Sequence, residues 1–567
     1  ENAIADVNTA DTYYENCEFS DSDSVEVLLS GGRHSLSNCR IVPNENSTAL
    51  DIRRGGHPKR KDLISTCNVT FRDTVIEGEN PKISLGPNTG VFLDEKSQAW
   101  QDSSGLRRHS SARLAKTPSF SFIIGRKADG SPIQAIGTGS HSFERKDADL
   151  TLDLVNQSPT TNAENAAEII TLVESFPEIS YPPSGNFYQG EDVAGQSLWR
   201  WILQISPDNI ILRDRPAHRK LGEALEEEGL FVNYLGEGSG QTLLIQVPGE
   251  RPEEARSRID RTPKEVATQL STHYGHKFSG SYIEALSLIA RLRLGHDEEV
   301  KKIAAAFLEG AKLPNNGGAI AGTLVFAQLD DEASRQRVID VANLAFDKDG
   351  KALEAMPTHS EMSDAVFMAS PLLAEAGRLS GDSKYFDQCL KHFQFIRDLC
   401  LRDDGIYRHS PLDDAAWGRG NGFPALGLAM VLEVFPEDHP GRAEILTEFQ
   451  NHMNALAAYQ DLTNDMWHQV IDHPESYAEF TCTNMISYAA LRGIQNGWLE
   501  EKEWEPRVWR AWSAIKSRIG TDGKTLVDAC TGTGKQKSLE DYFNRTAILG
   551  KDDRGGAMAL LFSTEMM

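Results

Sequence analysis

The sequence is poor in cysteine and in positive charge, and it has no long apolar run. Its 567 residues include seven cysteines but no CxxC pair, which argues against a zinc knuckle or a disulfide framework and favours buried free thiols. Basic residues number 58 against 83 acidic ones, for a formal net charge of -25. This balance argues against nucleic acid or an anionic membrane as a partner. No apolar stretch reaches the roughly eighteen residues of a membrane span, so we expect a soluble protein.

The first residues, Glu1–Asp6, also lack the basic and apolar regions of a signal peptide. A cleaved leader leaves no trace in a mature chain, so the compartment stays unknown, with a periplasmic or secreted location expected if a leader was removed. An acidic chain repels polyanionic sugars. An anionic ligand would therefore need a locally basic pocket, which directs attention to single arginines and histidines.

The length exceeds that of one hydrophobic core and predicts several domains. Residues 1–105 form a β-rich region, with strand-like runs such as Ser24–Leu29, Thr48–Ile52 and Asn68–Val75 between turn residues. The recurrence of "ENC", "SNC" and "STCNV" at spacings in the twenties favours a β-helix with a stacked small residue in each coil. An ordinary β-sandwich accounts for the same strands equally well.

Residues 117–255 alternate apolar strands with helical stretches, including a helix expected over 164–176, and predict a small α/β domain. This region has a weak resemblance to zinc carboxypeptidase-like domains. Such domains carry a His-x-x-Glu zinc pair in a loop that here reads Gln157–Asn162 without ligands. We therefore expect a non-catalytic domain and no metal or other cofactor.

Residues 263–567 show the pattern of about twelve amphipathic helices joined by Gly, Pro, Asn and Asp turns. The expected starts lie near residues 264, 280, 298, 318, 331, 360, 383, 422, 440, 478, 501 and 554. Six antiparallel pairs predict an (α/α)6 barrel. The number of helices alone fits an open solenoid equally well.

The first chemical motif is "THSEMSDAVF", which surrounds Asp364. Thr358 and Glu361 have the spacing of a capping box, so we expect a helix to begin just before Asp364. The apolar residues that follow would dehydrate this carboxylate and favour its protonated form, as a general acid requires. The alternative is that Asp364 only stabilises the positive end of the helix dipole.

The second motif is Gly-Arg-Gly-Asn-Gly at 418–422, which follows His409. We expect a loop that presents Arg419, Asn421 and two aromatic residues, Trp417 and Phe423, in one place. A guanidinium can bind a carboxylate with two parallel hydrogen bonds, and an aromatic ring can stack on a sugar. Alternatively, the glycines permit a tight turn and the aromatic residues belong to the core.

The third motif places His468 ahead of a helix expected to begin near Ala478. Thr481 and Thr483 would lie in its first turns, where hydroxyl and backbone N–H groups can bind an anion. A solvated loop histidine is the alternative for His468.

Together with the closing "KDDRGGAMALLFSTEM", these blocks resemble glycoside hydrolase families 105 and 88, the unsaturated rhamnogalacturonyl and glucuronyl hydrolases, over about 263–567. The resemblance implies an (α/α)6 barrel and hydrolysis without a metal. It implies that Asp364 protonates C4 of a C4=C5 double bond and then helps water to add at C5. It also implies a pocket around the uronic acid, whose candidate residues are His409, Trp417, Arg419, Asn421, Phe423, His468, Thr481 and Asn316.

Two positions depart from the family pattern. In "LPNNGGAIAG", Asn315, Asn316 or Gly317 occupies the place where relatives usually have an aspartate, so we expect the second carboxylate of the family to be missing. Phe423 lies where relatives commonly have tryptophan, which keeps the ring but removes an N–H donor. Both changes leave an altered substrate, slower chemistry or lost activity open.

The function expected is removal of a terminal 4,5-unsaturated uronic acid, glucuronyl or galacturonyl, from oligosaccharides that lyases produce. One alternative is a β-glucuronidase acting on saturated ends, which would need a second carboxylate such as Asp413, Asp414 or Glu479 opposite Asp364. The other is a catalytically impaired carbohydrate-binding protein. The expected partner is therefore the oligosaccharide, with no nucleic acid or membrane, and the oligomeric state stays open.

Overall fold

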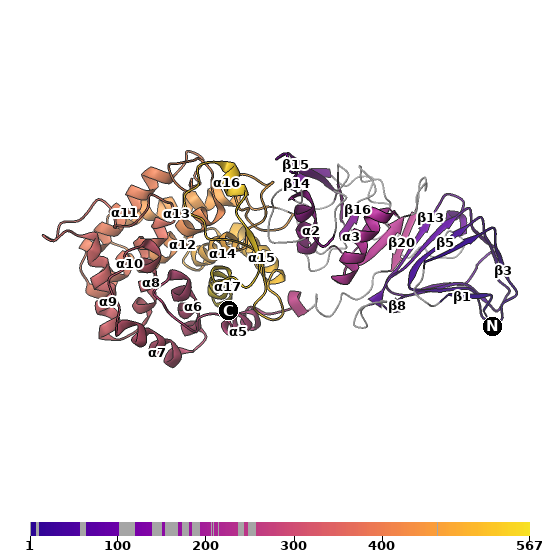
Figure 1. Ribbon diagram of the computed structural model, residues 1–567, viewed down its shortest axis with the longest axis horizontal. Helices are drawn as coiled ribbons and strands as arrows, with labels where there is room; N and C mark the ends of the chain where they lie inside the picture. The colour runs from indigo at the N-terminus through magenta and orange to yellow at the C-terminus, as the bar shows by residue number, and fades with distance from the viewer. Residues whose placement is uncertain are drawn as a thin grey trace. The chain divides into compact units, whose positions relative to one another are not determined.

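A computed structural model describes most of the chain. The described residues are 2–6, 11–56, 64–100, 119–138, 150–153, 168–172, 181–183, 193–205, 207, 209–213, 215–235, 243–247, 257–461 and 463–567. They divide into two compact units, one ending at 256 and one that contains residues 257–567 (Figure 1). We treat each unit by itself.

The first unit begins with three sheets of parallel strands, which is the arrangement of a parallel β-helix. One sheet has the order β1–β4–β7–β12, a second begins β2–β5–β10–β13, and a third has the order β11–β6–β3. Apolar side chains such as Val27, Leu36 and Val69 fill the space between the sheets. Parallel pairing throughout these coils selects the β-helix over the sandwich. The strands are β1 (Ile4–Asp6), β2 (Thr12–Glu15), β3 (Glu18–Ser20), β4 (Val25–Ser30), β5 (Gly32–Ser37), β6 (Arg40–Val42), β7 (Thr48–Arg53), β10 (Cys67–Arg72), β11 (Val75–Ile76), β12 (Ile83–Leu85) and β13 (Thr89–Leu93), with a short antiparallel pair of β8 (Gly55–Gly56) and β9 (Ile64–Ser65).

A stack of turn residues repeats from coil to coil. Asn16, Asn38 and Asp73 all have positive φ, and Asn38 Nδ2 donates a hydrogen bond of 2.6 Å to Asn16 Oδ1. Asn and Asp tolerate this left-handed backbone better than other non-glycine residues do. The stacking predicted for "ENC" and "SNC" is present, but Cys67 of "STCNV" lies inside β10, and Asp73 takes the third place.

The α/β part of the first unit is a six-stranded sheet in the order β14–β15–β17–β16–β18–β19. The helix expected over 164–176 is wrong for its described part, because Glu168–Leu172 is strand β17, paired with β15 and β16. The "TLLIQV" strand, β20 (Leu243–Val247), instead pairs antiparallel with β13 of the β-helix. The loop Gln157–Asn162 lies outside the described residues. The other elements are β14 (Ser119–Arg126), β15 (Pro132–Thr138), β16 (Leu150–Asp153), α2 (Val193–Ile205), β18 (Asn209–Arg213), α3 (Pro216–Glu227) and β19 (Val232–Leu235).

The second unit contains the twelve helices predicted from periodicity, each beginning at most five residues from its expected start. They are α5 (Pro263–Ser271), α6 (Tyr282–Arg293), α7 (Asp297–Leu308), α8 (Gly317–Gly322), α9 (Glu332–Ala342), α10 (Ala365–Ser380), α11 (Lys384–Cys400), α12 (Gly418–Val434), α13 (Arg442–Ala457), α14 (Phe480–Gln495), α15 (Glu501–Ser517) and α17 (Asp553–Glu565). A hairpin of β21 (Leu526–Cys530) and β22 (Ala547–Gly550) encloses the short helix α16 (Leu539–Phe543).

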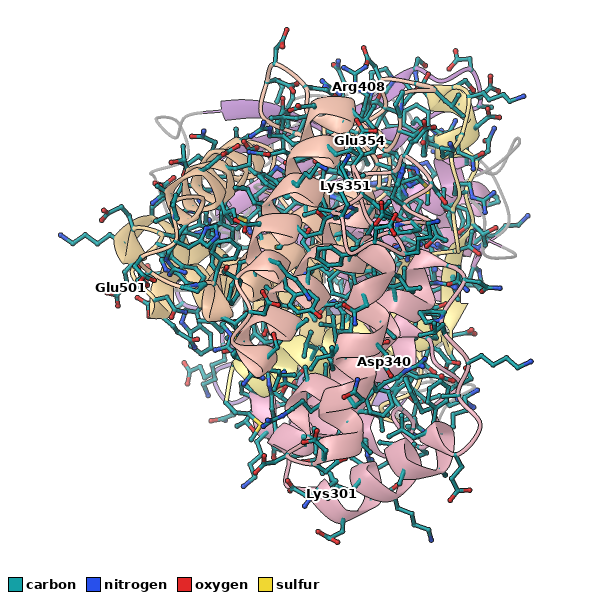
Figure 2. The ribbon with its side chains drawn as sticks, turned by 90° about the vertical axis from the view of Figure 1, so that its left-hand side faces the viewer. Lys301, Asp340, Lys351, Glu354, Arg408 and Glu501 are labelled. Atoms are coloured by element: carbon teal, nitrogen blue, oxygen red, sulfur yellow. The ribbon has the colours of Figure 1, made fainter. Side chains whose placement is uncertain are left out.

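Six of these helices form a closed inner ring. Helices α6, α8, α10, α12, α14 and α17 each pack on the next, and α17 packs back on α6. The outer helices α5, α7, α9, α11, α13 and α15 each pack on one inner helix. Their outward faces carry charged residues, among them Lys301, Asp340 and Glu501 (Figure 2). The contact between α17 and α6 makes the unit a toroid rather than an open solenoid.

Glycine lets one pair of segments in the ring approach closely. A Cβ atom at Gly322, the last residue of α8, would lie 2.0 Å from the carbonyl oxygen of Gly280. The chain continues from Gly322 as a 3-10 helix, η3 (Thr323–Gln328). Among the described residues, no helix has both the length and the apolar character to cross a membrane.

Candidate active site

Asp364 lies at the N-cap of the inner helix α10, and its side chain makes no capping hydrogen bond. The predicted capping box is wrong, because Thr358 and Glu361 have φ of 67° and 52° and the helix begins only at Ala365. Left-handed residues cannot form the first turn of a right-handed helix. The carboxylate of Asp364 therefore does not cap its own helix, and 8% of the residue remains exposed.

A buried histidine and a tyrosine stand behind Asp364. His409 Nε2 lies 3.3 Å from Asp364 Oδ1, and His409 Nδ1 lies 2.9 Å from the Tyr542 hydroxyl. Asp364 Oδ1 and His409 Nε2 have no hydrogen-bond partner among the described residues, so their contact is close but is not a hydrogen bond. The backbone N–H of Gln536 donates to the Tyr542 oxygen, at 3.3 Å.

Tyr542 and His409 are joined by a buried hydrogen bond. Burial raises the pKa of Tyr542, so its hydroxyl stays protonated and can donate to His409 Nδ1. The His409 ring is thereby held with its Nε2 atom facing Asp364 Oδ1. His409 is 0% exposed and lies between Asp364 and Tyr542.

Arg419 and Trp417 support the same region from the first turn of α12. Arg419 is buried and donates to Thr481 Oγ1 at 3.2 Å and to the carbonyl oxygens of Cys530 and Thr531 at 2.9 and 2.5 Å. Its guanidinium lies 4.8 Å from the Trp417 ring, which in turn packs on His409. Three of the five guanidinium N–H groups are thus committed to the protein. Arg419 joins α12 to α14 and to the end of β21.

The glycines of the Gly-Arg-Gly-Asn-Gly block serve close packing, because the block is the first turn of a buried helix and not the expected loop. A Cβ at Gly420 would lie 3.0 Å from Ser363 Oγ and 3.3 Å from the His409 ring. A Cβ at Gly418 would lie 2.5 Å from the His468 carbonyl oxygen. Larger residues would push α12 away from the segment that carries Asp364.

Asn421 and Phe423 are buried as well. The Asn421 amide donates to the carbonyls of Tyr407 and Trp417 and accepts from the Tyr407 N–H. Phe423 stacks on Phe367 with ring centroids 5.3 Å apart. Both residues hold α12 in the ring.

The positive end of α14 is occupied by the protein's own carboxylate. Glu479 is the N-cap, and it accepts hydrogen bonds from the backbone N–H groups of Thr481, Cys482 and Cys530 and from the Thr481 hydroxyl. The anion site predicted at this helix start is therefore filled from within. Helix α14 begins at Phe480, two residues after the expected start.

His468 and Asn316 have other partners. The two ring nitrogens of His468 lie 2.7 Å from the Ser476 carbonyl oxygen and 2.8 Å from Asp461 Oδ2, and its side chain is buried. Asn316 is exposed at the N-cap of α8, where it accepts from the Ala319 N–H at 2.9 Å. Of the eight predicted binding residues, Asn316 alone has an exposed side chain.

Two residues that sequence reasoning missed lie at the same end of the ring. Burial raises the pKa of Tyr282, the first residue of α6; the charge of Arg419 lowers this pKa, Asp364 raises it, and Arg554 lowers it. These residues lie at the N-terminal ends of the inner helices α6, α10, α12 and α17. The Arg554 side chain is 25% exposed and 3.1 Å from Asp552. The signal for Arg554 was its place in the closing sequence block.

The other carboxylates considered for a paired mechanism are differently placed. Glu479 is consumed as a helix cap, and Asp414 is an exposed partner of Arg408 at 2.8 Å. Asp413 accepts from the Ala415 N–H in the turn after His409. None of these contacts sets a second acid opposite Asp364.

Residues 315–567 match the model of the family described as Glycosyl Hydrolase Family 88. An unsaturated 3S-rhamnoglycuronyl hydrolase from Alteromonas sp. (strain LOR) is 29% identical over 174 residues, which are 29% of this chain and 42% of that relative. The unsaturated rhamnogalacturonyl hydrolase YesR of Bacillus subtilis (strain 168) is 26% identical over 249 residues, 40% of this chain and 70% of the relative. The chain thus spans less than half the length of the first of these relatives.

Among solved structures, one described as a possible member of the GH105 family from Salmonella enterica has 21% sequence identity and a TM-score of 0.47. The alignment covers 56% of this chain and 96% of that structure.

Proposed function

Residues 315–567 belong to Glycosyl Hydrolase Family 88, and from this premise we propose that the chain removes a terminal 4,5-unsaturated uronic acid from an oligosaccharide. The observation that carries the proposal is the isolated carboxylate of Asp364. It lies at the end of an inner helix, keeps some exposure, and has His409 3.3 Å behind it. A single oriented acid is what hydration of an enol ether requires, whereas ordinary glycoside hydrolysis uses two carboxyl groups.

The reaction would proceed in balanced proton transfers. Protonated Asp364 gives its proton to C4 of the C4=C5 double bond, and the positive charge that develops is shared by C5 and the ring oxygen. Asp364, now a carboxylate, accepts a proton from a water molecule whose oxygen bonds to C5. The resulting hemiketal opens, and the remaining sugar chain leaves.

His409 and Tyr542 would act as positioning residues in this scheme. His409 Nε2 lies 3.3 Å from one carboxylate oxygen of Asp364 and would restrict its rotation, which leaves the other oxygen available to the substrate. Because Tyr542 holds the opposite ring nitrogen, the imidazole cannot turn away. This pre-organisation lowers the cost of aligning the acid with C4.

The uronate carboxylate needs a cation that reaches solvent. Arg419 uses three of its donors on the protein and is buried, so we assign this role to Arg554, which is partly exposed and whose charge lowers the pKa of Tyr282. An arginine can bind a carboxylate with two parallel hydrogen bonds. Tyr282 is partly exposed and would offer its ring edge and hydroxyl to the sugar.

The test is turnover of unsaturated disaccharides, followed by the loss of the ultraviolet absorbance of the double bond. Asp364→Asn keeps the shape of the side chain and removes its acidity, and we expect it to lower kcat by at least about 10²-fold. Product analysis should show a free saturated sugar and the ring-opened keto acid. Retention of activity in this variant would refute the role of Asp364.

A matched control is Asp387→Asn, because Asp387 is an exposed carboxylate on the outer helix α11, 3.2 Å from His439. This second Asp–His pair should tolerate the same substitution without loss of turnover. Equal losses in both variants would contradict a specific role for the pair at Asp364.

A further inference from the structure

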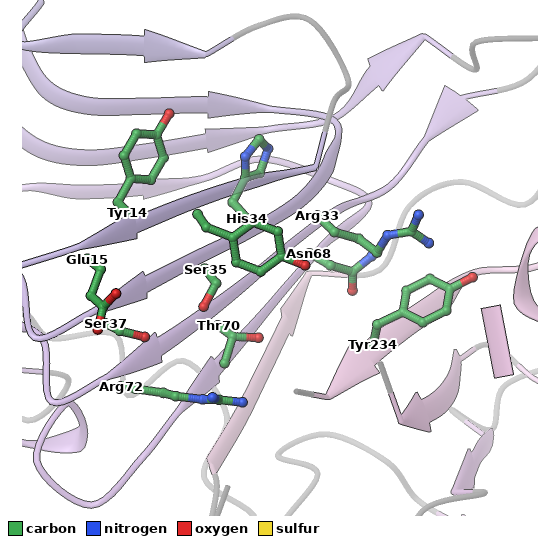
Figure 3. A pocket seen from close by; sticks show the side chains of 11 residues that line it. Tyr14, Glu15, Arg33, His34, Ser35, Ser37, Asn68, Thr70, Arg72 and Tyr234 are labelled. Carbon is green, nitrogen blue, oxygen red and sulfur yellow. The ribbon is translucent and has the colours of Figure 1, made fainter. Parts of the chain in front are cut away.

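The first unit contains a pocket on the outer face of its second parallel sheet. Its volume is about 420 Å³, within the range of about 300–1,000 Å³ of small-molecule sites. Strands β2, β5 and β10 supply its floor, and Tyr234 of β19 stands at its side (Figure 3). All of these elements belong to the first unit.

The floor of the pocket is built from rows of polar side chains. In the parallel register, Tyr13, Ser35 and Thr70 lie side by side, and Glu15, Ser37 and Arg72 form the next row. Neighbouring strands are about 4.8 Å apart, so each row offers hydrogen-bonding groups at a regular interval. That interval is close to the length of one pyranose unit, which suits a sugar chain lying across the strands.

An exposed aromatic ring borders these rows. Tyr13 is 71% exposed, the largest exposure among the described large hydrophobic side chains. Its hydroxyl accepts a hydrogen bond of 3.4 Å from Arg219 Nη2, and this contact restrains the ring without covering its face. A tyrosine that presents an apolar face beside polar groups is suited to stack on the C–H face of a pyranose.

The residues that line the pocket include two guanidinium groups, those of Arg33 and Arg72, and one carboxylate, that of Glu15. Arg33 is bound to Asp11 at 2.9 Å and lies over the Tyr234 ring at 4.7 Å, and Arg72 also has an interaction within the protein, so each guanidinium would share its donors between the protein and a ligand. Arg72 and Glu15 occupy opposite ends of one row, so a guanidinium and a carboxylate are separated by the Ser37 strand. Arg72 can bind a sugar carboxylate while Glu15 accepts from sugar hydroxyls.

We propose that this pocket is a non-catalytic binding site for an acidic oligosaccharide, which stacks on Tyr13 and places a carboxylate on Arg72. Its role is to hold an acidic polysaccharide or its fragments on the first unit. The site is independent of the reaction proposed for the helical unit, since it uses no residue from that unit.

The test measures binding of saturated tetragalacturonate and tetraglucuronate to the full chain by calorimetry, with cellotetraose as the neutral comparison. The acidic sugars lack the double bond and cannot be turned over by the proposed reaction. We expect one of them to bind at least about tenfold more tightly than cellotetraose. Equal affinities would overturn the acidic class, and no binding of either acid would overturn the site.

Two variants locate the binding. Tyr13→Ala should weaken the affinity roughly tenfold, the loss of one aromatic contact, while Tyr13→Phe should bind like the wild type. Arg72→Gln should weaken the affinity for the acidic sugar by about tenfold or more. Arg72→Lys keeps the charge but loses the planar guanidinium, so its affinity should lie between those of Arg72→Gln and the wild type.

The matched control is Trp509→Ala, which removes an aromatic side chain of 50% exposure from the helical unit. This variant should bind the acidic sugar like the wild type. If Tyr13→Ala binds normally, or if Trp509→Ala is equally weakened, the pocket is not the site. Turnover of an unsaturated disaccharide should be unchanged in Tyr13→Ala, which distinguishes failure of this site from failure of the proposed reaction.

Discussion

Substitution of Tyr542 by phenylalanine tests whether the buried chain behind Asp364 controls the acid. The change removes only the hydroxyl that meets His409 Nδ1 at 2.9 Å and accepts from the Gln536 N–H at 3.3 Å. His409 is 0% exposed, so water cannot replace the lost partner. The imidazole would then be free to turn, and turning would move Nε2 away from its place 3.3 Å from Asp364 Oδ1.

The expected size follows from the burial of the lost bond. A buried hydrogen-bonding group left without a partner costs about 1–3 kcal/mol. If this cost falls entirely on the orientation of Asp364 in the transition state, kcat should fall by about 5- to 150-fold. KM should change little, because Tyr542 is itself fully buried and does not reach the ligand.

The assay is the initial rate of double-bond loss as a function of substrate concentration and pH, alongside urea denaturation of each variant. Tyr385→Phe is the control, since Tyr385 is also buried and donates to Asn343 Oδ1 at 2.8 Å, but on an outer helix. Both variants should lose comparable stability, and only Tyr542→Phe should lose rate. A wild-type kcat and pH profile in Tyr542→Phe would refute the proposal that Tyr542 positions Asp364 through His409.

Three further predictions concern packing and charge. Gly420→Ala places a methyl group 3.0 Å from Ser363 Oγ and should cost about 1–3 kcal/mol in urea unfolding together with a fall in kcat; a variant of wild-type stability and rate would contradict the close-packing role. Glu479→Gln replaces the buried carboxylate that accepts three backbone N–H bonds, so the free energy of unfolding should fall by about 3–5 kcal/mol. A loss below about 1 kcal/mol, which is an ordinary effect of a single substitution, would contradict the role of Glu479 as the internal anion at the start of α14. Burial raises the pKa of Glu226 from 4.5 to about 7, so the folded protein holds its proton more tightly and this contribution to stability is lost as pH rises through that window. Glu226→Gln should flatten the pH dependence of unfolding there, and an unchanged slope would contradict it.

The helical unit was predictable because its signal is repeated. Each inner and outer helix carries its own apolar period and its own turn residues, so twelve starts could be placed within five residues. Closure of the ring was not predictable in this way, since it depends on contact between α6 and α17, at opposite ends of the unit. Strand β17 was wrongly predicted as part of a helix. Its five residues follow an alanine-rich segment that favours a helix, and only the pairing with β15 and β16 makes them a strand.

The sequence predicted which residues gather at the candidate site, but not which of their side chains are buried. The three motifs do meet, since Arg419 contacts Thr481 and His409 contacts Asp364. A motif gives the residues that gather, but not whether each side chain faces a ligand or a neighbouring helix. That choice is set by residues far along the chain, such as Tyr542, which lies 133 positions from His409 and had no local signal.

The burial of Arg419 shows why a family motif can mislead about roles. A guanidinium inside a protein must satisfy its donors, and here the carbonyls of Cys530 and Thr531 and the Thr481 hydroxyl do so. These bonds are available only because Glu479 caps α14 and also accepts from the Cys530 N–H, which holds β21 against the helix. The block around Arg419 is therefore needed to close one side of the ring before any ligand binds. Its substitution would remove activity whether or not Arg419 ever touches a sugar, so loss of activity alone cannot assign it to binding, whereas a rise in KM with unchanged stability would.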